Sequence, residues 1–325
     1  MKNASFKRIV EEAWQKRAAV RARTDAFRIL NGAASGTPGL IADMFAGYLT
    51  IYAYVSDLRE RYGDFPELLA EVAAAKVAVL KDRVSNREEE REASRDLLGS
   101  VPETVEVREG KLKFLVHPKH PRNVGLFLDT RPLRASLSES CPRHDVLNLF
   151  AYTCSLGVAA AWRNQGSVVN VDISQRYLAM GRENFRLNEL PEDRCLCKRM
   201  DSETYLDWAA RKSLDYDVVI LDPPSFSRFE GKTFSFAADY ARLLGKCTRL
   251  VRPGGRLFAL TNYSQISPSD FRELAKDAAR EGGRGFSDLR SLELPVDFDP
   301  SPESGESDWR PGGEGTLLAL EAEVI

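Results

Sequence analysis

The sequence of 325 residues lacks long apolar runs, paired cysteines and a histidine cluster. No stretch approaches the roughly 20 apolar residues that a membrane-spanning helix needs, and the charged first residues have no signal-peptide core. The five cysteines form neither a disulfide framework nor a two-pair metal site, and the three histidines lie away from Cys195 and Cys197. We therefore expect a cytoplasmic protein with reduced thiols, no metal ion and no membrane partner.

An excess of positive charge is also missing, since 46 lysines and arginines face 48 acidic residues and the net charge is −2. Overall charge therefore does not indicate nucleic-acid binding. The first 30 residues are the exception, with eight basic and three acidic residues. Two interpretations stay open for this segment: a solvated helix face, or an arm that contacts phosphates.

The first part of the chain mixes helical and strand patterns. Apolar residues at helical spacing predict a helix over 3–23, and the charged run 81–96 is expected to be exposed. The other predicted elements are strands at 27–30, 40–43, 48–54 and 77–80, a helix at 65–75, and a hairpin over 105–107 and 112–116. We predict a basic N-terminal helix over 1–25 and a small α+β domain over 26–118.

The pattern changes after residue 118, where short apolar runs alternate with helical segments. The predicted strands are 146–150, 168–171, 196–200, 218–221 and 256–260, completed by 288–294 and 316–325. Helices are predicted at 157–163, 174–188, 203–212 and 233–251. Strands buried on both faces indicate an α/β fold with a doubly wound parallel sheet, here a Rossmann-like seven-stranded sheet over 119–325. The stretch 297–315, rich in Pro, Gly and Ser, is expected to be a surface loop.

The stretch V-L-N-L-F-A-Y-T-C-S-L-G at 146–157 organises this domain. A strand ends in a turn, a helix follows, and the next strand ends in Asp172, a layout that holds an adenosine with its ribose hydroxyls on the acid. A dinucleotide site would need glycines for the pyrophosphate, but here only Gly157 is glycine. The turn therefore favours S-adenosylmethionine over NAD or FAD, with Asn148 and the turn backbone at the methionine moiety. An ordinary strand–helix turn is the alternative.

The next two strand ends also carry acids. Asp172 is expected at the ribose and Asp201 at the adenine amine. Each has a second interpretation, because Asp172 or Ser174 could cap one helix and Asp201 the next.

The fourth strand ends in Asp222-Pro223-Pro224-Ser225-Phe226, the most specific of these signals. Two prolines stop the sheet and form a rigid wall of carbonyls, against which a flat base can lie while an aromatic ring stacks on it. The fifth strand follows a P-G-G turn and ends in Asn262 and Tyr263, which lie at the same edge. An ordinary Pro-Pro turn is the alternative.

The order F-x-Y-T, V-D-x-S, N-x-x-L-N, D-P-P-x-F-S and P-G-G resembles class I S-adenosylmethionine-dependent methyltransferases. The stretch G-L-F-L-D-T-R-P-L-R at 125–134 resembles the signature before the first strand in large-subunit ribosomal RNA methyltransferases. Residues 27–43 resemble the central domain of that family. The resemblance implies that Phe127, Leu128, Asp129 and Arg131 border the cofactor and substrate site. Without it, Arg131 and Arg134 would be surface helix charges.

Two departures from the family pattern matter. Many members carry an N-terminal PUA module, whereas only the basic helix precedes the central domain here. The branch that makes 5-methylcytosine needs a cysteine after the fifth strand, because C6 of cytosine requires covalent attack. That position reads Thr261-Asn262-Tyr263-Ser264, so the sequence more closely resembles the branch that makes 7-methylguanine.

We therefore predict methyl transfer from S-adenosyl-L-methionine to a ring nitrogen of ribosomal RNA, with guanine N7 as the leading candidate. The residues predicted at the base are Asp222, Pro223, Pro224, Phe226 and Asn262, with Tyr263 as a second stacking ring. Those predicted at the cofactor are Phe127, Asp129, Arg131, Asn148, Phe150, Ala151, Tyr152, Thr153, Ser155, Gly157, Asp172, Ile173, Ser174, Asn188, Asp201, Ser202 and Asp222.

Other functions stay open at this point. They are a methyltransferase acting on another nucleic acid or on protein, a 5-methylcytosine enzyme with an atypical site, and a non-catalytic RNA-binding assembly factor. An NAD oxidoreductase is disfavoured by the missing glycines. A homodimer is possible.

Overall fold

The structure is a computed structural model that describes residues 2–84, 94–120, 123–229, 232–298 and 317–325. Contacts divide the chain into two compact units, Met1–Asp129 with Leu294–Ser307, and Thr130–Glu293 with Asp308–Ile325. Each unit is described by itself. Over the described residues, no helix is long and apolar enough to cross a membrane.

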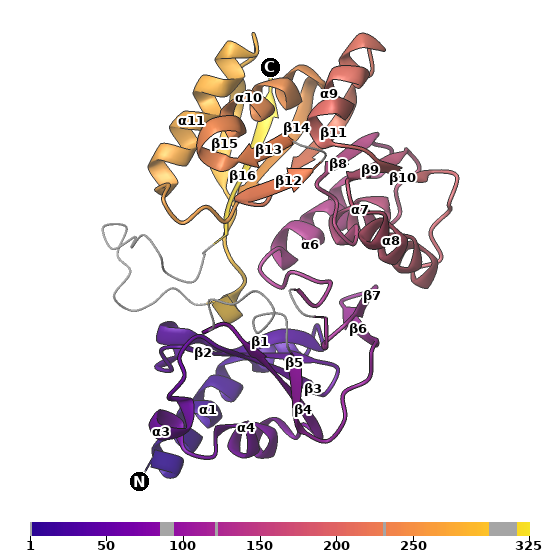
Figure 1. Ribbon diagram of the computed structural model, residues 1–325. Helices are drawn as coiled ribbons and strands as arrows, with labels where there is room; N and C mark the ends of the chain where they lie inside the picture. The colour runs from indigo at the N-terminus through magenta and orange to yellow at the C-terminus, as the bar shows by residue number, and fades with distance from the viewer. Residues whose placement is uncertain (1, 85–93, 121–122, 230–231, 299–316) are drawn as a thin grey trace. The chain divides into compact units, whose positions relative to one another are not determined.

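The first unit is built on a five-stranded sheet in the order β1-β2-β3-β4-β5 (Figure 1). Only β3 and β4 pair in parallel, since α3 and α4 form the crossover between them. The strands are β1 Ala26–Asn31, β2 Leu40–Phe45, β3 Tyr48–Ala53, β4 Val77–Asp82 and β5 Ser94–Leu98, followed by the hairpin of β6 Val105–Glu109 and β7 Leu112–Val116. The helices are α1 Lys2–Lys16, α2 Ala18–Arg21, α3 Leu58–Tyr62 and α4 Phe65–Ala73, with the short 3-10 helices η1 Gly32–Ser35 and η2 Val296–Phe298.

The basic N-terminal helix is part of the core of this unit. Phe6 and Val10 are buried at helical spacing on α1, and Lys7 pairs with Glu71 of α4 at 2.6 Å. The helix predicted over 3–23 is interrupted at Arg17. The guanidinium of Arg17 is buried and donates to the backbone carbonyls of Arg28 and Asp297, each at 3.3 Å.

The expected exposure of the charged run 81–96 is wrong at its first residue. Lys81 lies on β4 and is fully buried, and its ammonium donates to the backbone carbonyl of His120. A charge-based pattern missed this because residues 78–81 of β4 are all buried, and the partner of Lys81 at His120 is distant in sequence. Residues 85–93 of the run lie outside the described residues.

The segment after the predicted boundary at 118 belongs by its contacts to the first unit. Its backbone closes on itself through a hydrogen bond from His117 N–H to Val124 O at 2.6 Å. Val124, Leu126 and Leu128 are buried. The contact boundary falls after Asp129.

The second unit contains a seven-stranded sheet in the order β10-β9-β8-β11-β14-β16-β15, as the predicted Rossmann-like fold requires. The strands are β8 Val146–Leu149, β9 Val168–Asp172, β10 Cys195–Arg199, β11 Tyr216–Leu221, β14 Val251–Thr261, β15 Phe286–Ser291 and β16 Leu318–Val324. The strands β10, β9, β8, β11 and β14 pair in parallel, whereas β16 pairs antiparallel with both β14 and β15. An alternation of strands and helices carries no signal for the direction of such an inserted strand.

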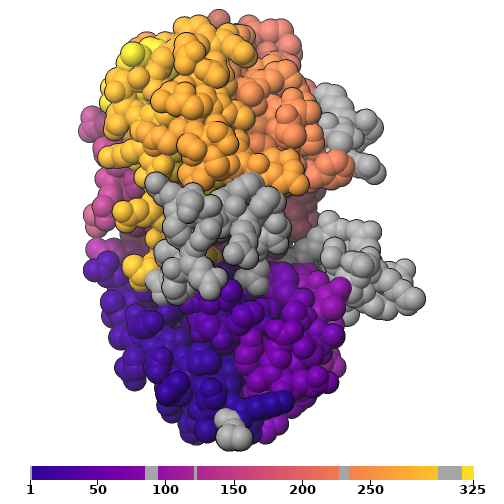
Figure 2. Space-filling view, turned by 90° about the vertical axis from the view of Figure 1, so that its left-hand side faces the viewer, coloured from indigo at the N-terminus to yellow at the C-terminus, as the bar shows by residue number. Residues whose placement is uncertain are grey.

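Helices cover both faces of this sheet (Figure 1). They are α6 Arg131–Ser140, α7 Ser155–Ala161, α8 Gln175–Leu187, α9 Ser202–Arg211, α10 Phe236–Arg249 and α11 Pro268–Glu281. The last three pack against one face with the core residues Leu149, Val171 and Leu221. Figure 2 shows the surface that α10 and α11 present, coloured orange. Two of these elements were not predicted from the sequence: α11, and the hairpin of β12 Phe226–Phe229 and β13 Lys232–Ser235.

The P-G-G sequence lies inside β14 as an irregularity and not before it. Tyr216 pairs with Val251 and Val218 with Arg256, so β14 carries extra residues between these two pairs. Gly254 has φ +77°, and a Cβ at Gly255 would lie 2.8 Å from the carbonyl oxygen of Asp217. Glycine is therefore needed at both positions for the strand to bulge and return to register.

Candidate active site

The polar strand ends predicted from the sequence meet at one edge of the second unit's sheet. The strands β10, β9, β8, β11 and β14 are neighbours and parallel, so their carboxyl ends share that edge. Across the edge follow Asp201, Asp172, the turn after β8, Asp222 and Asn262. The connection order reverses between β8 and β11, and open α/β sheets bind their ligands in the crevice at such a point.

The turn between β8 and α7 is held in an unusual backbone conformation. Phe150, Tyr152 and Cys154 have φ of 55°, 51° and 59°. Non-glycine residues avoid this region, and each instance costs on the order of 1–3 kcal/mol. Such strain persists only where surrounding bonds impose it and is concentrated at functional sites.

Hydrogen bonds impose the conformation of this turn. Cys154 N–H donates to Ala151 O at 2.7 Å, and Ala151 N–H donates to Val171 O at 3.0 Å. Tyr152 N–H donates to the Asp172 carboxylate at 2.8 Å. The turn is thus fixed both to itself and to the end of β9.

Residues of helix α8 and its C-cap also hold this turn, through hydrogen bonds and close packing. The amide of Asn184 donates to Thr153 O at 3.0 Å, and the amide of Asn188 donates to Asn184 O at 2.8 Å. A Cβ at Gly181 would lie 2.4 Å from the sulfur of Cys154. Asn188, predicted at the cofactor, therefore reaches the turn through Asn184, the first asparagine of the N-x-x-L-N motif. Thr153 and Ser155 are buried in the turn.

Two residues predicted at the cofactor lie in the interior of the sheet layer. Asn148 is 1% exposed and its amide donates to Asn170 Oδ1 at 2.9 Å. Gly157 of α7 packs on that same amide, since a Cβ there would lie 2.0 Å from Asn170 Oδ1. Close helix–sheet packing accounts for this glycine, and contact of either residue with the cofactor stays a prediction.

Asp172 is the most constrained acid of the edge. Its second carboxylate oxygen accepts from Ser174 N–H at 2.8 Å. Burial raises the pKa of Asp172 above the ordinary aspartate value of 3.8, although the backbone donors oppose the rise. The helix cap is Ser174, whose hydroxyl accepts from Tyr177 N–H at 3.3 Å. Ile173 between them is half-buried.

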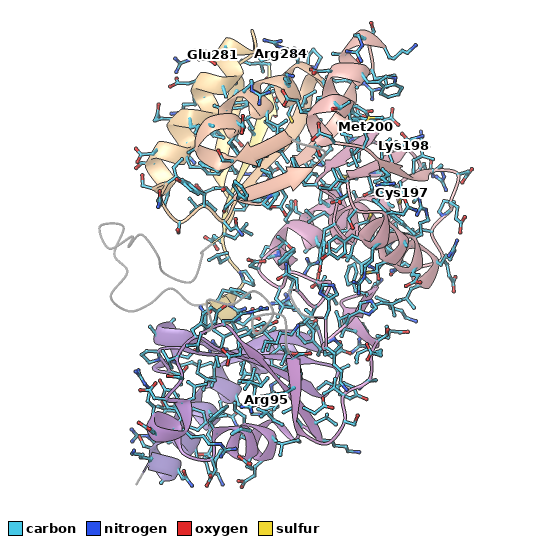
Figure 3. All side chains as sticks on the ribbon, viewed as in Figure 1. Arg95, Cys197, Lys198, Met200, Glu281 and Arg284 are labelled. Carbon is cyan, nitrogen blue, oxygen red and sulfur yellow. The ribbon has the colours of Figure 1, made fainter. Side chains whose placement is uncertain are left out.

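Asp201 caps α9, as its second interpretation proposed. One carboxylate oxygen accepts from Thr204 N–H at 2.9 Å and from the Thr204 hydroxyl at 2.8 Å. Ser202 is buried in the first turn of the helix. Figure 3 labels Cys197, Lys198 and Met200, which trace β10 up to this cap. The contact of Asp201 with an adenine amine stays a prediction.

The Asp-Pro-Pro edge lies on the other side of the turn. Asp222 follows β11, Pro223 is buried and Pro224 is exposed. Phe226 opens the hairpin with 54% of its surface exposed. The hydroxyl of Ser225 donates to Asn262 Oδ1 at 2.8 Å and so joins the ends of β11 and β14. Ser225 is not among the residues predicted at the site, although its place between Pro224 and Phe226 is a usable signal.

The two candidate stacking rings differ in their surroundings. The ring of Tyr263 stacks on Phe236 with 4.6 Å between centroids and 22° between planes. Its hydroxyl donates to Gln265 at 2.8 Å. Tyr263 is half-buried and 54% of Phe226 is exposed, so Phe226 is the more accessible surface for a base.

The residues carried over from the G-x-F-L-D-x-R signature fall in both units. Phe127 and Asp129 belong to the first unit, and Arg131 begins α6 in the second. Their role stays a prediction. Arg134 is not a surface charge, because it is fully buried and donates to the Thr130 hydroxyl at 2.6 Å.

The chemistry of the edge fits a cationic cofactor. Asp172, Asp201 and Asp222 are the acids of its strand ends. The turns 150–155, 172–174, 201–202, 222–226 and 261–264 contain no lysine or arginine of their own, and Arg199 of β10 donates to Ile173 O at 3.3 Å. A sulfonium and an ammonium group suit this charge, whereas a pyrophosphate does not. Among the described residues, no group of side chains could hold a metal ion.

Comparison with known proteins decides the family. Residues 54–306 match the S-adenosylmethionine-dependent methyltransferase family. The chain belongs to this family. It is therefore an enzyme whose cofactor is S-adenosyl-L-methionine, as predicted.

The relatives of this methyltransferase carry consistent names. Bacillus subtilis YwbD, named provisionally as a ribosomal RNA large subunit methyltransferase, is 30% identical over 280 residues, which cover 85% of this chain and 70% of YwbD. A ribosomal RNA large subunit methyltransferase of Deinococcus radiodurans is 33% identical over 279 residues, covering 82% and 67% of the two chains.

A solved structure of SMU.776, provisionally a methyltransferase, in complex with SAH has a TM-score of 0.87 at 25% identity. The match covers 99% of this chain and 82% of SMU.776. The likeness supports the same family assignment over nearly the whole chain.

Proposed function

We propose that this methyltransferase acts on a base of large-subunit ribosomal RNA and transfers the methyl group to a ring nitrogen, with guanine N7 as the leading candidate. The observation that carries the proposal is the Asp222-Pro223-Pro224-Ser225-Phe226 edge, which lies beside the cofactor turn because β8 and β11 are paired neighbours. The names of the Bacillus and Deinococcus relatives support an RNA acceptor.

We assign the cofactor and the base to opposite sides of the point where the connection order reverses, which lies between β8 and β11. On the side of β8, β9 and β10, the turn 150–155 would hold the methionine moiety, with Asp172 at the ribose and Asp201 at the adenine. On the side of β11 and β14, Asp222 and the proline carbonyls would position the base, with Phe226 stacked on it and Asn262 as a polar contact. The methyl donor and the acceptor base would then lie at adjacent strand ends.

A ring nitrogen is the acceptor that best suits these residues. The bound cofactor supplies a methyl group activated by a sulfonium, and guanine N7 has a lone pair of its own. The protein then needs to orient the base in line and to exclude water, and no side-chain nucleophile is required.

The cysteines support this choice over cytosine C5, which needs a thiolate. No cysteine stands in 261–264 after β14. The hydrogen bond to Cys197 and complete burial raise the pKa of the Cys154 thiol, and burial also raises the pKa of Cys247. Thiols in such surroundings are poor nucleophiles.

The test is a comparison of modified nucleosides in ribosomal RNA. RNA from cells that lack the gene is compared by mass spectrometry with RNA from cells complemented by the wild type or by Asp222→Ala. We expect one 7-methylguanosine of the large subunit to disappear and to return only with the wild type. Loss of a different methylated nucleoside, or of none, would refute the assignment to N7. Unchanged RNA with restored cell function by Asp222→Ala would indicate a binding factor instead.

A further inference from the structure

The side chains of Ser225 and Asn262 contact each other at the acceptor side of the site, and a rigid backbone holds both residues in place. Ser225 follows two prolines, and its carbonyl accepts from Phe236 N–H at 3.0 Å at the start of α10. Asn262 follows Thr261, which is 1% exposed and pairs with Leu318 of β16. The Ser225 hydroxyl and Asn262 Oδ1 are 2.8 Å apart.

This hydrogen bond gives the Asn262 amide a direction. A carboxamide has an acceptor end and a donor end, and a serine hydroxyl that donates to Oδ1 engages the acceptor end. The two N–H groups of Nδ2 then point away from Ser225. Since Asn262 is exposed, these donors are available to an incoming base.

We propose that Asn262 is a specificity-determining residue that donates to a carbonyl oxygen next to the methylated nitrogen, and that Ser225 is the positioning residue that sets its amide. In guanine, the O6 acceptor lies beside N7, whereas adenine presents the N6 amine there. A donor-presenting amide therefore accepts guanine and rejects adenine. This inference rests on the proposed function, because it assumes a purine that presents this edge.

The expected size of the effect follows from a single neutral hydrogen bond. Such a bond contributes on the order of 1 kcal/mol, which corresponds to a preference of about five- to tenfold in kcat/KM. Adenine should be disfavoured further, because its N6 amine and the Asn262 amide are both donors and would face each other.

The experiment uses the full-length protein and a transcript of the ribosomal RNA segment in which nucleoside mapping locates the modification. The target carries guanine or 2-aminopurine, which keeps N7 but lacks O6. Four proteins are compared: the wild type, Asn262→Ala, Ser225→Ala, and the control Ser138→Ala, whose hydroxyl bonds within α6. Initial rates of methyl transfer give kcat/KM for each pair, and calorimetry reports S-adenosylmethionine affinity as a check of folding.

We expect the wild type and the control to prefer guanine over 2-aminopurine by about five- to tenfold. Asn262→Ala should lower the guanine rate to the 2-aminopurine rate and abolish the preference, and Ser225→Ala should reduce the preference in part. Cofactor affinity should stay unchanged. Asn262→Asp, which presents an acceptor in place of a donor, should lower the guanine rate more than Asn262→Ala does.

The two ways of failing are distinguishable. If no transcript receives a methyl group from the wild type, the proposed function fails. If the wild type methylates guanine but does not discriminate against 2-aminopurine, or if Asn262→Ala keeps the preference, only the present inference is overturned.

Discussion

The backbone N–H of Tyr152 donates to the carboxylate of Asp172 at 2.8 Å, so the end of β9 holds the strained turn that follows β8. The Asp172 side chain therefore has two roles in our account of this site. It fixes the backbone conformation of the turn, and it is the acid that we propose to bind the ribose hydroxyls. Its removal should disturb both.

Asp172→Asn should weaken S-adenosylmethionine binding by about tenfold or more, because an amide accepts the Tyr152 N–H less strongly than a carboxylate does. The measurement is isothermal titration calorimetry at neutral pH. Asp288→Asn, on the exposed strand β15, is a matched control and should bind normally. Equal affinities in both variants would contradict the role given to Asp172.

The pH dependence of binding tests the same residue independently. Burial raises the pKa of Asp172 above 3.8, so its carboxylate is protonated at a higher pH than an ordinary aspartate. Ribose hydroxyls and the N–H of the turn favour the ionised form. Wild-type affinity should therefore fall as the pH is lowered through that raised pKa, whereas Asp172→Asn should lack this step. A step of the same size in the variant would assign the titration elsewhere.

Gly157→Ala should destabilise the second unit by about 1–3 kcal/mol, because the added methyl group would overpack the buried amide of Asn170. The new Cβ would lie 2.0 Å from Asn170 Oδ1. Urea unfolding of Gly157→Ala, Asn170→Ala and the double variant forms a thermodynamic cycle. The double variant should lose less stability than the sum of the two single variants, because truncation of Asn170 removes the side chain that the new methyl group would meet. Strict additivity would contradict the packing argument.

Lys81→Met should stabilise the protein near neutral pH, by on the order of 1 kcal/mol, because a buried charge is costly. Burial lowers the pKa of Lys81 to about 7, from 10.5 in the unfolded chain. The unfolded state therefore binds more protons between these values, and wild-type stability should gain from this residue as the pH rises from 7 to 10.5. Unfolding midpoints across that range should rise less steeply in the variant. An identical pH profile would rule out this titration.

Arg252→Met should destabilise the second unit by about 1 kcal/mol at pH 7. Its guanidinium bridges Asp217 at 2.6 Å, Asp215 at 2.8 Å and Asp145 at 3.1 Å. Burial acts to raise the pKa of Asp145, but hydrogen bonds from Ser167 and Arg252 outweigh it and leave the pKa below 3.8.

The lowered pKa of Asp145 predicts how the stability contributed by the cluster of Arg252, Asp145, Asp215 and Asp217 changes at low pH. The stability contributed by Asp145 is present above pH 3.8 and is lost as the pH falls through its lower folded value. The difference in unfolding free energy between wild type and Arg252→Met should therefore shrink in strong acid. The exposed pair of Arg280 with Asp277 provides the control, and Arg280→Met should change stability by less than about 0.5 kcal/mol.

The sequence predicted the carboxyl edge of the sheet well because its signals are local. A strand, a turn, a helix and an acid follow one another between 146 and 172, and the family comparison confirms the cofactor that this order indicated. The Asp-Pro-Pro ending was readable because proline itself ends a strand.

The remaining differences depend on contacts distant in sequence. The amide of Asn148 donates to Asn170 of the next strand, a contact that the sequence pattern does not indicate, and its contact with the cofactor stays a prediction. Arg134 and Lys81 have the composition of surface residues, and only tertiary packing buries them. The direction of β16 is likewise decided by its neighbours and not by its own residues.

The position of β16 also has a consequence for how the chain folds during synthesis. This strand is the last described element of the chain, yet it lies between β14 and β15, which leave the ribosome before it. Until residues 318–324 emerge, β15 has no partner strand and one side of β14 is open. The end of β14 carries Asn262, so the acceptor side of the site should mature later than the cofactor turn, whose strands pair first.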